Sequence, residues 1–171
     1  KQLDGRMVND LVLADIQAKL AANPESVELQ NLAAEAARSK EQGPDKPFLD
    51  VWFENETHGF VVGAYNLLFE TSDGGRTWQS WFDRAENPRF MNLYAIRPAA
   101  GGLFIAGESG TVLKLDPVAR RFISVSVDYR GSLFGVVGAG DAVLVFGLRG
   151  SAFRSADSGA EIAHFGARCV Q

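Results

Sequence analysis

The sequence predicts a mainly β fold, a partial β-propeller of three four-stranded antiparallel blades that follows an N-terminal helical hairpin. Two observations support this prediction. First, three short apolar runs each end in a glycine, at Gly63, Gly107 and Gly147, and these glycines are 44 and then 40 residues apart. A repeat of this length, with four short strands in each copy, is typical of propeller blades. Second, residues 1–43 lack this repeat and instead space their apolar residues as helices do.

Residues at other equivalent positions also match between the three copies, and each such set is called a column here. They are Leu49, Leu93 and Leu133; Trp52, Ile96 and Val136; Asn66, Gly110 and Gly150; Trp78, Phe122 and Ile162; and Trp81, Val125 and Phe165. Asn and Gly in the third column tolerate a left-handed turn. We expect the blades to span 48–84, 92–128 and 132–168. Their strands are predicted at 49–54, 59–64, 67–72 and 77–83; at 93–97, 102–107, 111–115 and 121–127; and at 133–138, 142–147, 151–155 and 161–166.

The helical hairpin is predicted from an apolar stripe in which Val8, Val12 and Ile16 recur every four residues. Asn23 is expected to cap a second helix that starts at Pro24, because proline suits a first helical position. The segment 43–47 contains a glycine and two prolines and ends the helical pattern. The predicted domains are therefore 1–43, the hairpin, and 44–171, the blades.

One turn motif recurs in the first and third copies. Asp-Gly-Gly between two apolar runs predicts a hairpin, in which the aspartate accepts hydrogen bonds from its own turn. We therefore assign the motif a structural role. Its residues are Thr71, Asp73, Gly75, Thr77 and Trp78 in the first copy and Ser155, Asp157 and Gly159 in the third.

Composition and charge exclude several classes of function. The chain has 171 residues and a net charge of −4, which argues against a nucleic-acid partner. The single cysteine, Cys169, forms no internal disulfide, and no apolar run is long enough for a membrane-spanning helix. The two histidines, His58 and His164, lack metal-ligand spacing, so we expect no metal and no cofactor. The chain starts at Lys1 without a signal-peptide pattern, and we expect an upstream portion in the intact protein.

The motif at 71–78 resembles the Asp box of the bacterial neuraminidase repeat. The longer run 49–81 is similar to the repeats of the photosystem II stability/assembly factor family, and a weaker resemblance extends over 48–168. The second copy departs from the pattern, because 115–122 keeps Asp116 without the glycine of the box. The resemblance implies a non-catalytic scaffold that helps to assemble or stabilise a membrane-associated complex through a protein partner. It also implies an extracytoplasmic, periplasmic location.

The alternative function is an Asp-box glycoside hydrolase of the sialidase kind, or a carbohydrate-binding protein. Sialidases use a tyrosine nucleophile, and their family also uses an arginine triad. Neither the tyrosines nor the arginines of this chain stand in a motif that matches those roles, so we predict that the chain is not an enzyme. The candidates considered were Tyr65, Tyr94, Tyr129, Arg97, Arg149 and Arg154. A third hypothesis is an adaptor whose helical hairpin contacts the partner.

Two surfaces are candidates for binding. The turns between the second and third strands share one face with the connections between blades, and a mixed-charge face with an aromatic residue suits a protein partner. At each position the alternative to a binding role is a side chain that is simply exposed to solvent at the rim. The candidate residues on this face are Tyr65, Glu108, Ser109, Arg149, Arg84 and Arg130. The second surface comprises the open flanks of the three-blade arc, where we expect self-association through Leu49, Trp52 and Phe53 on one side or Leu133, Val136 and Val137 on the other.

Overall fold

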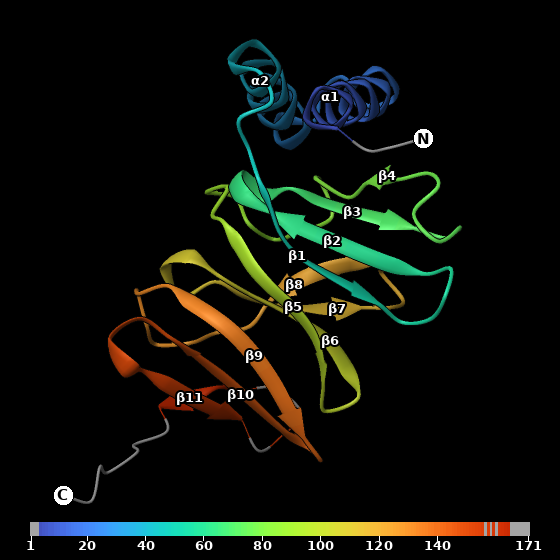
Figure 1. Ribbon diagram of the computed structural model, residues 1–171. Helices are drawn as coiled ribbons and strands as arrows, with labels where there is room; N and C mark the ends of the chain where they lie inside the picture. Colours follow the sequence, from blue (N-terminus) through green and yellow to red (C-terminus); the bar gives the residue numbers. More distant parts are fainter. Residues whose placement is uncertain (1–3, 156, 158, 160, 165–171) are drawn as a thin grey trace, which may run out of the picture.

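The computed structural model describes residues 4–155, 157, 159 and 161–164, in which two helices precede three four-stranded antiparallel sheets (Figure 1). The predicted fold class is confirmed. The helices are α1 (Gly5–Ala22) and α2 (Val27–Gln42). Blade 1 contains β1 (Phe48–Phe53), β2 (Gly59–Gly63), β3 (Leu68–Thr71) and β4 (Gln79–Ser80). Blade 2 contains β5 (Leu93–Ala99), β6 (Gly102–Gly107), β7 (Val112–Asp116) and β8 (Arg121–Ser124). Blade 3 contains β9 (Leu133–Ala139), β10 (Ala142–Gly147), β11 (Ala152–Ser155) and β12 (Ala163–His164). The end of the predicted last strand, with Phe165, lies outside the described residues.

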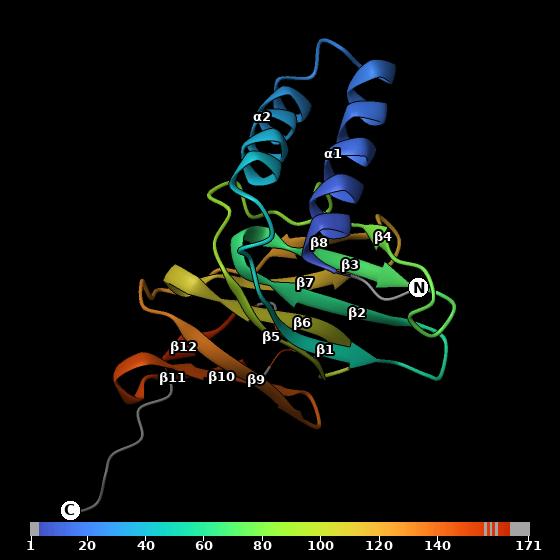
Figure 2. The same ribbon diagram turned by 45° about the horizontal axis from the view of Figure 1, so that its top comes forward.

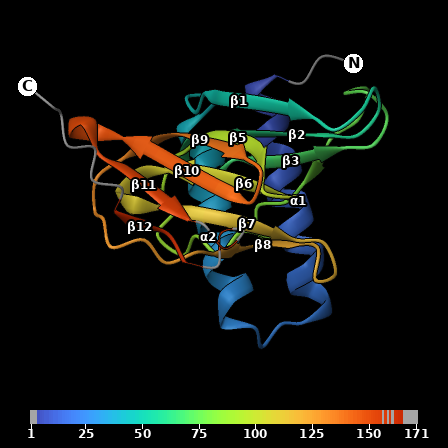
Figure 3. The same cartoon turned by 90° about the horizontal axis from the view of Figure 1, so that it is seen from below.

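Alternate residues of each strand point to opposite sides of its sheet, so each blade has two faces that can pack. The three blades stack face to face. The first strands β1, β5 and β9 gather on one side of the molecule, and β8 and β12 lie on the other (Figure 3). Two apolar clusters fill the interfaces. Blades 1 and 2 bury Phe60, Val62, Leu68 and Trp81 against Leu93, Ile96, Ile105 and Leu113. Blades 2 and 3 bury Phe104, Ala106 and Val112 against Leu133, Val136, Val145 and Phe153.

The register of β1 corrects two of the predicted repeat columns. Leu93 pairs with Gly107 and Leu133 with Gly147, but the partner of Gly63 is Phe48 and not Leu49. In the same way, Val51 and not Trp52 is the counterpart of Ile96. The reason is that the stretch from the start of β1 to the glycine that ends β2 is one residue longer than the equivalent stretches of the other blades. A register change of one residue moves every side chain to the other face of the strand.

The start of α2 also differs from the prediction. Its N-cap is Ser26, whose Oγ accepts a hydrogen bond from the Leu29 N–H at 3.3 Å. Asn23 instead follows the end of α1, and its N–H donates to the carbonyls of Lys19 and Leu20. The N-cap prediction for Asn23 with Pro24 was therefore wrong. A serine satisfies the first N–H groups of a helix as well as an asparagine does.

The hairpin packs on the outer part of blade 1 and stands over β3 and β4 (Figure 2). The contacting side chains are Val8, Val12, Ile16, Leu32 and Ala36 from the helices and Val61, Leu67, Phe69 and Phe82 from the blade. Strand β1 stays uncovered, so that Leu49 and Phe53 are 42% and 40% exposed. In the described part of the chain, neither helix is long and apolar enough to cross a membrane.

Three of the residues predicted on the open flanks lie elsewhere. Leu133 and Val136 are buried between blades 2 and 3, and Trp52 packs on the cluster between blades 1 and 2. Leu133 and Val136 are on the face of β9 that meets blade 2, whereas Val137 points away from it and is 49% exposed. The flank prediction was thus wrong for these three residues, and Leu49, Phe53 and Val137 are exposed on the flanks.

Candidate binding sites

Three turns between the second and third strands present matched side chains on one face of the arc. Tyr65, Ser109 and Arg149 occupy the middle of these turns with φ values of 52°, 54° and 60°. Such left-handed conformations are uncommon for residues other than glycine. The next residue in each turn, Asn66, Gly110 or Gly150, also has a positive φ, as the sequence predicted.

Polar contacts surround the first two of these turns. The Tyr65 N–H donates to Asn92 Oδ1 at 2.9 Å, and the Lys46 ammonium lies 5.2 Å from the centre of the Tyr65 ring. The Glu108 carboxylate accepts from the Asn92 N–H at 3.2 Å. These contacts hold blade 1 to the start of blade 2 and leave the Tyr65 side chain 53% exposed.

The connection between blades 2 and 3 forms a polar hollow of about 560 Å³ on the same face, lined by Ser109 and Arg130 among others. Arg84 does not join these residues. It runs beside the outer strand β8, where its carbonyl accepts from the Phe122 N–H, and its guanidinium lies 4.9 Å from the Trp81 ring. The structure thus brings Tyr65, Glu108, Ser109, Arg149 and Arg130 to one face and places Arg84 at the seam between blades 1 and 2.

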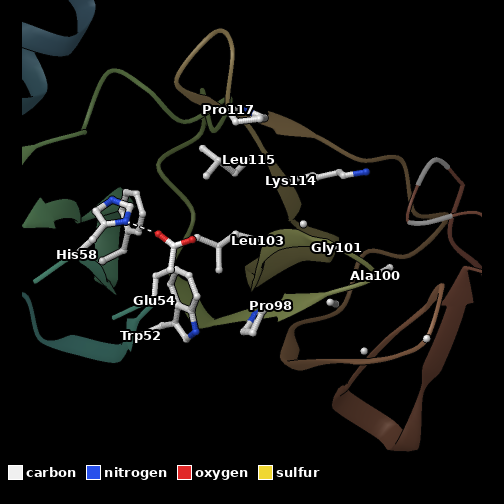
Figure 4. Close-up of a pocket in the computed structure, with 15 residues that line it drawn as sticks. Trp52, Glu54, His58, Pro98, Ala100, Gly101, Leu103, Lys114, Leu115 and Pro117 are labelled. Atoms are coloured by element: carbon white, nitrogen blue, oxygen red, sulfur yellow. Dashed lines mark hydrogen bonds and ion pairs between the residues drawn. The ribbon is translucent and has the colours of Figure 1, made fainter. Parts of the chain in front are cut away.

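A second hollow, of about 580 Å³, opens at the opposite ends of the strands and is called the seam hollow here (Figure 4). Leu103 and Leu115 lie at its centre, Trp52, Glu54 and His58 line one side, and Lys114 projects on the other. Phe60 and Leu103 are almost fully buried beneath it. The remaining lining residues are Pro98, Ala99, Ala100, Gly101, Gly102, Pro117, Gly138 and Gly140.

Glu70 is the centre of a polar network beside this hollow. Its carboxylate is only 11% exposed and accepts from the Trp81 Nε1–H at 2.9 Å and from the Arg120 guanidinium at 2.8 Å. Arg120 belongs to the turn between β7 and β8, so its bond to Glu70 in β3 joins blade 2 to blade 1. The same guanidinium lies 5.3 Å from the Trp81 ring. A buried carboxylate is stable only with such partners.

His58 joins the network from the turn between β1 and β2. Its Nδ1 lies 2.8 Å from Glu54 Oε2, and its Nε2 lies 3.0 Å from Glu70 Oε1. Partial burial alone would lower the pKa of His58, but the hydrogen bonds and charges of Glu54 and Glu70 outweigh it and raise the pKa. From the sequence, His58 was considered only as a possible metal ligand, and this network was missed. The residue that could have pointed to this network is Glu70, because it is charged and lies within a strand that is buried along its whole length.

The Asp-box turn is closed by its own side chains. Asp73 accepts from the Thr77 N–H at 2.9 Å and from the Thr77 hydroxyl at 2.6 Å, and the Thr71 hydroxyl accepts from the Gly75 N–H at 2.9 Å. The Thr77 hydroxyl, together with the Thr77 N–H, lowers the pKa of Asp73 to about 2. Every one of these groups stabilises the turn, and Gly75 has the positive φ of 83° that the turn requires. Trp78 packs edge to face on Phe53.

The corresponding turns of the other blades differ in detail. In blade 3, the Gly159 N–H donates to Ser155 Oγ at 2.8 Å and the Glu161 N–H to Asp157 at 3.2 Å, as in the first box. In blade 2, Asp116 instead accepts from the N–H groups of Val118 and Ala119, and this hairpin forms without a box glycine. Among the described residues, no group of three or more His, Cys, Asp or Glu side chains could hold a metal ion.

Three stacked blades, of which the first and third have Asp-box turns, define a β-propeller of the neuraminidase-repeat type. The model of one such family, "Photosynthesis system II assembly factor YCF48", matches residues 30–161, and the chain belongs to this family. The resemblance that the repeat motifs indicated is thereby confirmed.

Individual relatives match shorter stretches. "Photosystem II assembly lipoprotein Ycf48" of Synechococcus sp. (strain RCC307) is 51% identical over 47 residues, which is 28% of this chain and 14% of the relative. "Photosystem II stability/assembly factor HCF136, chloroplastic" of Arabidopsis thaliana is 31% identical over 75 residues, which is 44% of this chain and 17% of the relative. The matched segments thus span less than a fifth of these curated relatives.

Two solved structures share the fold. The structure described as "YCF48 bound to D1 peptide" has a TM-score of 0.57 at 24% identity, and it covers 68% of this chain and 40% of its own. The structure of YCF48 from Cyanidioschyzon merolae has a TM-score of 0.55 at 18% identity, with coverages of 68% and 39%. At these identities the likeness shows the fold alone.

Proposed function

We propose that this chain is a non-catalytic propeller module that binds a segment of another protein and assists the assembly or stability of a membrane-associated complex. One observation carries the proposal, namely the match of the YCF48 family model to residues 30–161, which include nearly all of the three blades. The relatives are named as photosystem II assembly factors, and one solved relative is described as bound to a D1 peptide. An extracytoplasmic location is part of the proposal, supported by the word lipoprotein in the names of the cyanobacterial relatives.

The seam hollow is the site that we propose for the bound segment. Binding sites are concave and largely apolar, with a few polar groups that orient the ligand. Here the half-buried side chains of Trp52 and Leu115 provide the apolar surface above the buried Leu103, and the Glu54–His58 pair provides a polar edge (Figure 4). This arrangement suits an extended peptide that inserts one aliphatic side chain between polar backbone contacts. The opposite face, with Tyr65 and Arg149, suits polar contacts at the rim of a larger interface.

A peptide array tests this proposal. Overlapping synthetic peptides that cover D1 are titrated into the chain by fluorescence anisotropy, with an array from an unrelated soluble protein as the control. We expect saturable binding of one or two neighbouring D1 peptides. Leu115→Asp places a charge in the hollow and should weaken that binding at least tenfold, about 1.4 kcal/mol. Val118→Asp is the matched control, because Val118 is 94% exposed in the turn that follows Leu115 and does not line the hollow. Equal losses in both variants, or no binding by any D1 peptide, would contradict the proposal.

A glycosidase assay tests the non-catalytic part. We expect no hydrolysis of sialosides or other aryl glycosides, because the Asp73 carboxylate is occupied by hydrogen bonds inside its own turn. Turnover that disappears when a single tyrosine or carboxylate is replaced would contradict this part of the proposal and favour the glycoside hydrolase.

We also propose self-association through the exposed flank of blade 3. Leu144 and Phe146 stand at the repeat positions of Phe104 and Ala106, which blade 2 buries completely against blade 3. Phe146 is 46% exposed and lies on the same face of the sheet as Val137. A second copy that covers this flank should bury more than about 1,000 Å². Sedimentation velocity at micromolar concentration should show a dimer that Phe146→Asp dissociates, and a monomeric wild-type chain would contradict self-association.

A further inference from the structure

The side chain of His58 bridges two carboxylates, one from its own turn and one from strand β3. Its Nδ1 faces Glu54 at the start of the β1–β2 turn, and its Nε2 faces Glu70 in β3. Ionised carboxylates only accept hydrogen bonds, and a neutral imidazole has a single N–H donor. Both contacts therefore require a doubly protonated imidazolium, which forms a charge-assisted hydrogen bond with each carboxylate.

We propose that His58 is a proton-operated latch at the rim of the seam hollow, which holds the Glu54 carboxylate when charged and releases it when neutral. The latch does not depend on which ligand the hollow binds, and its test is separate from the peptide array.

The charged groups around His58 decide which of the two contacts is lost first. Arg120 donates to both oxygens of Glu70, at 3.1 and 2.8 Å, and Trp81 donates to the same carboxylate, so Glu70 keeps partners without the imidazolium. The Glu70 side chain is also largely buried, at 11% exposure, whereas Glu54 is 59% exposed and water can solvate it at little cost. A neutral His58 therefore keeps its one proton for the buried Glu70 and gives up Glu54.

Release of Glu54 changes the charge at the rim. With His58 charged, the two carboxylates are balanced by the imidazolium and the Arg120 guanidinium. With His58 neutral, the cluster carries one net negative charge, and that charge lies on Glu54, which lines the hollow. Lys114 stands on the far side of the hollow and is the other charged group that lines it. The Phe60 ring, whose centre lies 5.3 Å from that of the imidazole, is neutral.

The direction of the pH dependence follows from the raised pKa of His58. The bridging interaction is fully present below about pH 6.5, where the histidine of an unfolded chain is also protonated. It is lost as the pH rises through the higher pKa of the folded state. The latch is therefore closed in acidic conditions and open in alkaline conditions.

Proton NMR of the imidazole resonances tests the latch in the whole chain. His58→Gln assigns the signal of His58, since His164 is the only other histidine. We expect His58 to titrate above about 6.5, the value of an unperturbed histidine. In Glu54→Gln its pKa should fall, while Glu56→Gln is the matched control and should leave it unchanged, because Glu56 lies in the same turn but is exposed and does not contact the imidazole.

A second readout follows the turn itself. Amide exchange at residues 54–58, corrected for the intrinsic effect of pH, should become faster as His58 loses its proton. In His58→Gln, whose side-chain amide does not titrate, the corrected exchange should be independent of pH. A His58 pKa at or below about 6.5, or equal effects of Glu54→Gln and Glu56→Gln on that pKa, would overturn the proposal. Corrected exchange in the wild-type chain that does not change with pH would overturn it as well.

Discussion

The two seams between blades use the same strand positions but close them with different chemistry. At the seam of blades 1 and 2, Asp50 accepts from the Ile96 N–H and pairs with Arg97, and Glu70 pairs with Arg120 across the interface. At the seam of blades 2 and 3, the position of Glu70 is occupied by Lys114, whose ammonium lies 5.4 Å from the Phe104 ring.

The last hairpin of each following blade explains the difference. In blade 2 this hairpin brings the long side chain of Arg120 to the carboxylate of Glu70. In blade 3 it brings Gly159, where an added Cβ atom would lie only 2.6 Å from the Phe104 ring, so the ring packs directly on the backbone. The same repeat thus forms a charged seam in one place and an apolar seam in another. Which of the two forms depends on one residue of the last hairpin and on the strand residue that faces it.

The largest expected effect is at the apolar seam. Phe104→Ala removes a fully buried ring and should destabilise the chain by about 3–5 kcal/mol. Because the phenylalanine ring does not titrate and most of the loss is apolar burial, urea unfolding should give the same difference between variant and wild type at pH 5 and pH 8. A loss that varies strongly with pH would show that the two seams are less distinct than their contacts indicate.

The next effect is at the charged seam. Glu70→Ala leaves the Trp81 Nε1–H and the Arg120 guanidinium without their acceptor and should cost about 1–3 kcal/mol. Arg154→Ala is the control in the same strand position of blade 3. Arg154 is exposed there, and its replacement should stay within about 0.5 kcal/mol in urea unfolding. Similar losses in the two variants would remove the distinction between the seams.

A smaller effect is expected at the Asp-box turn, which lies outside both seams. Asp73→Ala removes the acceptor of the Thr77 N–H and hydroxyl, but these groups are close to water, so the loss should be less than that of Glu70→Ala. The pKa of Asp73 is lowered from 3.8 to about 2. Its stabilising contribution is therefore present above about pH 4 and is lost as the pH falls through about 2. Thermal unfolding of variant and wild type between pH 2 and pH 6 should thus converge at the acidic end, and a constant difference would contradict this account.

The repeat could be predicted from the sequence because its signals are local. Each apolar run ends at a glycine, and the Asp73 turn is closed by side chains within seven residues of one another. The predicted positions of Tyr65, Ser109 and Arg149 in matched turns follow from the same short-range pattern.

The features that were missed depend on contacts between distant segments. The network of Glu54, His58, Glu70 and Arg120 joins three parts of the chain, and no spacing rule brings residue 120 beside residue 70. The register of β1 depends on one extra residue between the start of β1 and the glycine that ends β2, which leaves the apolar pattern unchanged. Sequence pattern identifies which residues are buried more readily than which partner they meet.

The most direct test of the charged seam is a double-mutant cycle between Glu70 and Arg120. Free energies of unfolding are measured in urea for the wild-type chain, Glu70→Ala, Arg120→Ala and the double variant. If the two side chains bind each other across the seam, the losses should be non-additive, with a coupling energy between about 0.5 and 3 kcal/mol. Losses that add to within about 0.3 kcal/mol would show that the pair does not hold blades 1 and 2 together.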